Sequence, residues 1–203
     1  WACASAGEVA QVDAIVEEHV DFGALFDQAG SPGPLDPASL VVTEVDAGGN
    51  PLSGPLTVQF NADSPGASAG TLLFQLPGET PAGASRRALI EFDHSASAAF
   101  APQVGPAGQV TVTDTVDEGQ DAFKISTPRA DWYLQKQGAS FSSVVDAAGK
   151  DWVGYHPTGQ FDGTYRGIGQ LTDDYFHPGG LLSSVTRDSG SSGPLKAVFN
   201  ATS

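Results

Sequence analysis

Residues 40–60 read LVVTEVDAGGNPLSGPLTVQF, and this stretch decides the fold class. Residues 40–45 are rich in β-branched side chains, which favour a short strand. Residues 46–50 are Asp-Ala-Gly-Gly-Asn, residue types that form tight turns. Residues 56–60 alternate apolar and polar side chains, as a half-buried strand does. The stretch therefore predicts short strands separated by turns.

The same signals continue on both sides of this stretch. The chain has 25 Gly and 14 Pro among 203 residues, and this turn-rich composition favours a β protein. Further strands are predicted at residues 9–20, 70–76, 87–92, 110–113, 122–126, 131–136, 140–145, 151–155, 181–186 and 195–200. Helix signals are limited to residues 22–28, which Asp21 can cap, and to a single turn at residues 38–40. We expect an all-β protein.

Residues 94–109 separate two groups of predicted strands. They are mostly Ala, Ser, Pro and Gly, and we expect a flexible linker there. The flanking segments, residues 7–93 and 110–203, predict two consecutive β-sandwich domains, immunoglobulin-like or jelly-roll-like. The last residues still follow a strand pattern, which suggests an incomplete second domain. Either the polypeptide continues past residue 203, or another chain supplies the closing strands.

The first six residues, WACASA, are typical of a signal-peptide remnant or tail. Ala4-Ser5-Ala6 fits the small-residue pattern before a cleavage site, with Gly7 as the mature start. A lipidated Cys3 and an arbitrary chain boundary are the alternatives. A processed leader predicts a protein that is secreted, extracellular or held at the cell surface. No apolar run approaches the ~20 residues of a membrane-spanning helix, so we expect no membrane span.

The charge and the cysteine count narrow the function classes. The formal net charge is −15, which opposes binding to nucleic acid. Such a surface also suits bound cations or simply solubility. Cys3 is the single cysteine, so no disulfide can form within the chain and no cysteine-based metal site is available.

Two sets of segments resemble a group of secreted bacterial β-sandwich proteins associated with polysaccharide processing. The N-terminal sandwich module of that group is similar to residues 35–46, 58–60, 70–72 and 76–83. The opening of its main sandwich domain is similar to residues 123–127, 132–133, 138–146, 149–152, 165–168 and 175–179. The resemblance implies a carbohydrate substrate class. The chain departs from the group's pattern at Gly169-Gln170, where the relatives have Pro-Asn, and at residues 171–174, where they have His-Pro.

The densest polar and aromatic cluster lies in residues 152–178. Sugars stack their C–H faces on aromatic rings and use their hydroxyls as hydrogen-bonding groups. We predict the substrate-binding residues to be Trp152, Tyr155, His156 and Tyr165. In a catalytic version Arg166 would hold a uronate carboxylate in a bidentate hydrogen bond, and His177 or Tyr175 would act as the base of a polysaccharide lyase.

Other interpretations of this segment stay open. Aromatic residues at strand ends also pack over the edge of a sandwich, and a His-Pro pair can simply shape a loop. A glycoside hydrolase would need two facing carboxylates, for which Asp162, Asp173 and Asp174 are available. Asp173 and Asp174 could instead bind Ca²⁺, and no other cofactor is predicted.

Two hypotheses of function follow. The first is a secreted protein that binds or processes an extracellular polysaccharide. The second is a non-catalytic structural or filament subunit of the extracellular space, assembled by β-strand complementation. The strand pattern at residues 195–203 favours self-association, or a further polypeptide that completes the second domain.

Overall fold

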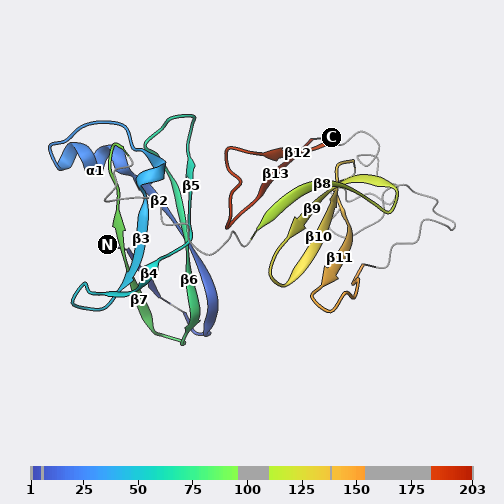
Figure 1. Ribbon diagram of the computed structural model, residues 1–203, viewed down its shortest axis with the longest axis horizontal. Coiled ribbons are helices and arrows are strands. Elements are labelled where there is room, and N and C mark those ends of the chain that lie inside the picture. Colours follow the sequence, from blue (N-terminus) through green and yellow to red (C-terminus); the bar gives the residue numbers. More distant parts are fainter. Residues whose placement is uncertain (1, 6, 96–109, 138, 154–183, 203) are drawn as a thin grey trace. The chain divides into compact units, whose positions relative to one another are not determined.

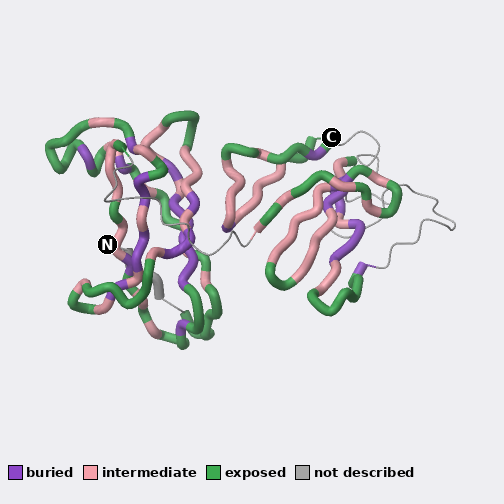
Figure 2. The backbone as a smooth tube through the Cα atoms, in the orientation of Figure 1, coloured by how far each residue is buried: buried purple, intermediate pink, exposed green. Residues whose placement is uncertain are grey.

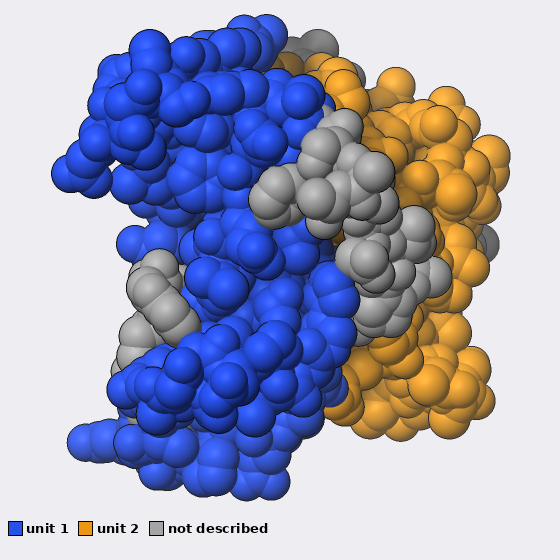
Figure 3. Space-filling view, turned by 60° about the vertical axis from the view of Figure 1, so that its left-hand side comes forward, with its two compact units in different colours: residues 1–108 blue, residues 109–203 orange. Residues whose placement is uncertain are grey.

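The structure is a computed structural model that describes residues 2–5, 7–95, 110–137, 139–153 and 184–202. The chain divides into two compact units, Trp1–Gly108 and Gln109–Ser203, which we call unit 1 and unit 2 (Figure 3). Strands dominate both units, so the all-β prediction is confirmed. Among the described residues, no helix combines the length and hydropathy needed to cross a bilayer.

Unit 1 contains two antiparallel sheets, with strand orders β1-β7-β3-β4 and β2-β6-β5 (Figure 1). The strands are β1 (Ala2–Ser5), β2 (Gln11–Asp21), β3 (Val41–Val45), β4 (Pro51–Pro55), β5 (Val58–Ala62), β6 (Ala69–Thr80) and β7 (Ser85–Glu91). Residues 2–5, expected to be a leader remnant or tail, thus form a strand at the edge of the first sheet.

One hydrophobic core lies between these sheets, visible as buried segments along β3 and β6 in Figure 2. Val42 of β3, Phe74 of β6 and Ala88 of β7 all belong to it. The predicted helix is confirmed as α1 (Phe22–Gln28). Asp21 caps it as predicted, since its Oδ1 accepts a hydrogen bond from Ala24 N at 2.9 Å. That helix adds two buried phenylalanines to the core.

One arginine side chain of unit 1 makes contacts in both of its sheets. Arg86 of β7 donates from Nε and Nη2 to the two carboxylate oxygens of Glu44 of β3, at 2.6 and 2.5 Å. Its Nη1 donates to the carbonyl oxygen of Pro77 in β6. The guanidinium therefore contacts both sheets, and its hydrogen bond to Glu44 raises the pKa of Arg86 above the ordinary arginine value.

Unit 2 contains an antiparallel sheet of order β11-β10-β9-β8 and a hairpin of two strands. The strands are β8 (Thr111–Asp117), β9 (Gln120–Ser126), β10 (Ala130–Gln135), β11 (Phe141–Asp146), β12 (Ser184–Asp188) and β13 (Val198–Thr202). Leu134 of β10 and Val185 of β12 share one buried cluster, with Phe199 of β13 packed against it. The hairpin thus covers part of the larger sheet.

Some predicted elements differ in the structure. Residues 51–55, for which no strand was predicted, form β4 at the edge of a sheet. Of the strand predicted at residues 151–155, the described part is limited to a single bridge between Asp151 and Val145. Residues 38–40 were predicted as one turn, and a 3-10 helix occupies Pro37–Ser39.

Candidate functional site

Trp152 is the one predicted site residue within the described part of the chain. The predicted substrate-binding residues Tyr155, His156 and Tyr165 lie outside it, and so do the predicted catalytic residues Arg166, Tyr175 and His177 and the carboxylates Asp162, Asp173 and Asp174. These assignments stay predictions. The described part of the candidate site therefore consists of Trp152 and the turn that precedes it.

The indole of Trp152 is exposed and at the same time held in place. The residue is 64% exposed, and it is the one aromatic residue among the large hydrophobic residues exposed in the described part of the chain. Its Nε1 donates to Asp146 Oδ2 at 2.8 Å, and its main-chain N donates to the carbonyl oxygen of Val144 at 2.9 Å. The ring is thus anchored at its polar edge, and most of the residue's surface is left in water.

The turn between β11 and Trp152 positions this anchor. Asp146 Oδ1 accepts hydrogen bonds from the main-chain N–H groups of Ala148 and Lys150, at 2.9 and 3.0 Å. Gly149 adopts a φ of 81°, which an L-residue with a side chain adopts only under strain. The hydrogen bonds from Lys150 N and from the Trp152 indole lower the pKa of Asp146. A carboxylate is therefore the stable form of this anchor.

Lys150 lies over the face of the indole. Its Nζ is 3.8 Å from the ring centroid, close enough for a cation–π interaction. Among the described residues, Lys124 and Lys136 make ion pairs with carboxylates, whereas no such pair is found for Lys150. The described contact of this ammonium group is therefore the one with the face of the indole.

Asp151 fixes the start of the segment that follows the turn. Its Oδ1 accepts hydrogen bonds from Val144 N at 3.0 Å and from Val153 N at 2.9 Å. Burial raises the pKa of Asp151, but the hydrogen bonds from these two main-chain groups outweigh that effect, so its pKa lies below the ordinary value. The two aspartates on either side of the turn therefore hold Trp152 by its side chain and by its flanking backbone.

Unit 2 also contains a buried polar cluster that sequence reasoning missed. Ser142 Oγ and Ser143 Oγ both donate to Asp117 Oδ2, at 2.5 and 2.8 Å. Gln135 is buried beside Ser140, and its Nε2 has no hydrogen-bond partner among the described residues. The sequence signal that could have indicated this cluster is the pair of serines in β11, which interrupts any alternation of apolar and polar residues. The described residues of unit 2 include no histidine that could activate a serine.

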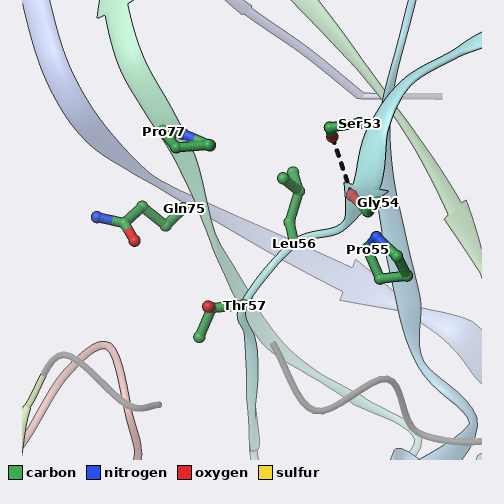
Figure 4. Close-up of a pocket in the computed structure, with 7 residues that line it drawn as sticks. All are labelled: Ser53, Gly54, Pro55, Leu56, Thr57, Gln75 and Pro77. Atoms are coloured by element: carbon green, nitrogen blue, oxygen red, sulfur yellow. Dashed lines mark hydrogen bonds between the residues drawn. The ribbon is translucent and has the colours of Figure 1, made fainter. Parts of the chain in front are cut away.

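Unit 1 carries a pocket of about 210 Å³ between the β4–β5 connection and β6 (Figure 4). Leu56 and the two prolines, Pro55 and Pro77, give it an apolar lining, with hydroxyl and amide groups from Ser53, Thr57 and Gln75. None of its lining residues is ionisable, so the pocket offers no acid or base. It suits an apolar group better than a catalytic site.

Within the described residues, no three His, Cys, Asp or Glu side chains come close enough together to hold a metal ion. The predicted Ca²⁺ ligands Asp173 and Asp174 lie outside those residues. Searches against protein-family models, curated proteins and solved structures find no match for this chain. The resemblance to secreted polysaccharide-processing proteins therefore stays a prediction.

Proposed function

We propose that this protein binds an extracellular polysaccharide, with Trp152 as the stacking surface for a sugar ring. The observation that carries the proposal is an exposed indole held by its Nε1 hydrogen bond to Asp146. Holding the ring before the ligand arrives lowers the conformational entropy lost on binding. An aromatic ring with a carboxylate at its polar edge and an ammonium group over one face matches a ligand that has apolar C–H faces and hydroxyl groups.

The composition of the chain supports a sugar over other ligands. A net charge of −15 disfavours nucleic acid and anionic lipid. The charged groups beside Trp152 are Asp146, whose carboxylate accepts hydrogen bonds, and Lys150, whose ammonium donates them. Sugar hydroxyls use both kinds of partner.

The remaining predicted residues extend the same proposal. Tyr155, His156 and Tyr165 would enlarge the sugar-binding surface beyond Trp152. Arg166 would anchor a uronate carboxylate, and His177 or Tyr175 would supply the base if the protein is a lyase. Secretion, the two β-sandwich domains and Ca²⁺ at Asp173 and Asp174 belong to the proposal as well.

A binding panel tests the proposal. The intact chain is run in native gels that contain one soluble polysaccharide each, neutral or uronate-containing, and retardation is measured. We expect retardation by at least one polymer, and an affinity about tenfold lower for Trp152→Ala, equivalent to ~1.4 kcal/mol. Leu52→Ala is the matched control, because Leu52 follows a similar turn in unit 1 and is 61% exposed. Equal retardation of wild type and Trp152→Ala by every polymer would overturn the proposal.

A second assay separates binding from catalysis. A polymer that retards the protein is incubated with it, and new unsaturated chain ends are followed by ultraviolet absorbance. A lyase produces such ends, and Arg166→Ala lowers their rate of formation. If wild type and Arg166→Ala are equally inert towards a bound uronate polymer, the lyase hypothesis is wrong and the binding hypothesis stands.

A further inference from the structure

The edge of β7 in unit 1 is occupied by the short strand β1. The two strands are antiparallel, with Ala2 opposite Ala88, Cys3 opposite Arg87, Ala4 opposite Arg86 and Ser5 opposite Ser85. On its other side β7 pairs with β3. Without β1, therefore, β7 would be an open edge of this sheet, with unpaired N–H and C=O groups.

The pairing of β1 with β7 depends on main-chain groups. Residues 2–5 are Ala-Cys-Ala-Ser, so no side chain in the strand is larger than a thiol. Main-chain pairing at a sheet edge is a general mode of recognition that any extended strand can use. The same four residues of a second copy would offer β7 the same hydrogen-bonding groups in the same register.

The connection after β1 is short and crosses between sheets. β1 ends at Ser5 in one sheet and β2 begins at Gln11 in the other, and residues 7–10 between them are exposed. The described contact that ties this connection down is the hydrogen bond from Gly83 N to Gly7 O, 2.9 Å long. A short hinge between an edge strand and its domain is the arrangement that favours strand exchange between protomers.

Three exposed apolar residues follow this hinge closely in the sequence. Val9 is 74% exposed, Val12 58% and Ile15 45%, and all three lie within seven residues of one another in the chain. They account for three of the seven large hydrophobic residues exposed in the described chain. A second copy seated at the hinge would remove this apolar surface from water, which favours association.

We propose that two copies of this chain exchange β1, so that each copy's residues 2–5 pair with β7 of the other copy. The register is the one seen within a single chain, with Cys3 opposite Arg87. Val9, Val12 and Ile15 then lie at the junction of the two copies. The predicted strand complementation concerned residues 195–203 of the second domain, whereas this assembly joins β1 to β7 in unit 1, and it does not depend on polysaccharide binding.

The single native cysteine makes the exchange measurable. Residues directly opposite on antiparallel strands have Cα atoms ~4.5–5.5 Å apart, which lies within the ~4.4–6.8 Å that a disulfide spans. Arg87 is exposed, so Arg87→Cys places a second thiol opposite Cys3 at little structural cost. Oxidation then links one chain to itself in the closed form and two chains to each other in the exchanged form.

The Arg87→Cys protein is equilibrated at micromolar to millimolar concentration, oxidised, and separated by non-reducing electrophoresis. We expect a covalent dimer whose fraction rises severalfold over this range. Wild type and Val116→Cys are matched controls, since Val116 is an exposed residue of β8 that is not paired with β1. Both report chance oxidation between chains.

A second variant separates exchange from other contacts. Ala4→Pro in the Arg87→Cys background removes a main-chain donor from β1 and should lower the covalent dimer to the level of the controls. The proposal is overturned if Arg87→Cys yields only internally linked monomer at every concentration. It is also overturned if the dimer persists with Ala4→Pro, or if the controls give as much dimer as Arg87→Cys does.

Discussion

The turn after β3 in unit 1 and the turn after β11 in unit 2 have the same main-chain design. Asp46 N donates to Asn50 O at 2.9 Å, and Asp146 N donates to Lys150 O at 3.0 Å. In both turns the aspartate Oδ1 also accepts hydrogen bonds from the main-chain N–H groups two and four residues later. The two hairpins differ in what the second carboxylate oxygen binds.

Asp46 Oδ2 accepts from the side-chain amide of Asn50, so the carboxylate bonds only within its own turn. Asp146 Oδ2 accepts instead from the indole of Trp152. The residue that matches Trp152 in unit 1 is Leu52, which is equally exposed but has no polar atom to anchor. The same type of turn therefore closes a hairpin in unit 1 and also orients an exposed aromatic ring in unit 2.

The largest expected effect comes from the glycine of each turn. Gly49 and Gly149 have φ values of 84° and 81°. Alanine at either position should lower the free energy of unfolding by about 1–2 kcal/mol, because a Cβ disfavours this conformation. Denaturant titration measures both losses. Polysaccharide affinity should fall for Gly149→Ala alone, and an equal fall for Gly49→Ala would remove the functional distinction between the turns.

Asp146→Asn and Asp46→Asn each replace the second carboxylate oxygen, which accepts a hydrogen bond from Trp152 in one turn and from Asn50 in the other. With its carbonyl oxygen bound to the turn, the asparagine at position 146 points an NH₂ group at the indole N–H, and tryptophan has no acceptor to offer in return. At position 46 the amide of Asn50 can reverse and present its oxygen. We expect about a tenfold loss of polysaccharide affinity, ~1.4 kcal/mol, for Asp146→Asn only. Equal affinities for the two variants would show that the indole hydrogen bond does not orient Trp152.

Acid should open both turns and release the indole in one of them. The side-chain and main-chain hydrogen bonds of Asn50 lower the pKa of Asp46, and those of Lys150 and Trp152 lower the pKa of Asp146. Each carboxylate therefore stabilises the fold above the ordinary aspartate value, about pH 4, and this stabilisation is lost as the pH falls through the lowered folded-state value.

The NMR signal of the Trp152 indole N–H follows this loss directly. We expect it to shift with a midpoint below the ordinary aspartate value, and Asp46→Asn should leave that midpoint in place. A midpoint at or above the ordinary aspartate value would contradict the lowered pKa of Asp146. Asp146→Asn should abolish the transition.

Local signals made much of the fold predictable from the sequence. A run of β-branched side chains predicted β3, the alternation of apolar and polar side chains predicted β5, and Asp21 before an apolar face predicted α1. β4 was missed because the prolines at its two ends are typical of a turn. It is a strand because it pairs with β3, a tertiary interaction. Local pattern cannot show such tertiary pairing.

The candidate site was predictable in part. Trp152 was predicted from its residue type. The roles of Asp146 and Lys150 depend on the geometry of the turn, which brings both side chains to Trp152, six and two residues further along the chain. The likeness of DAGGN at residues 46–50 to DAAGK at residues 146–150 was present in the sequence. It was missed because three identical residues in five do not indicate a repeat until their hydrogen bonds are compared.

The smallest expected effect concerns the cation over the ring. Lys150 Nζ lies 3.8 Å from the Trp152 centroid, whereas the matching positions in unit 1 are Asn50 and Leu52, which are neither cationic nor aromatic. Lys150→Gln should lower the free energy of unfolding by ~0.5–1 kcal/mol, the size of an exposed cation–π interaction. Lys150→Arg should retain the wild-type value, because a guanidinium also stacks on an indole. Denaturant titration of the two variants distinguishes charge from side-chain length, and an equal loss in both would show that the ammonium does not steady the ring.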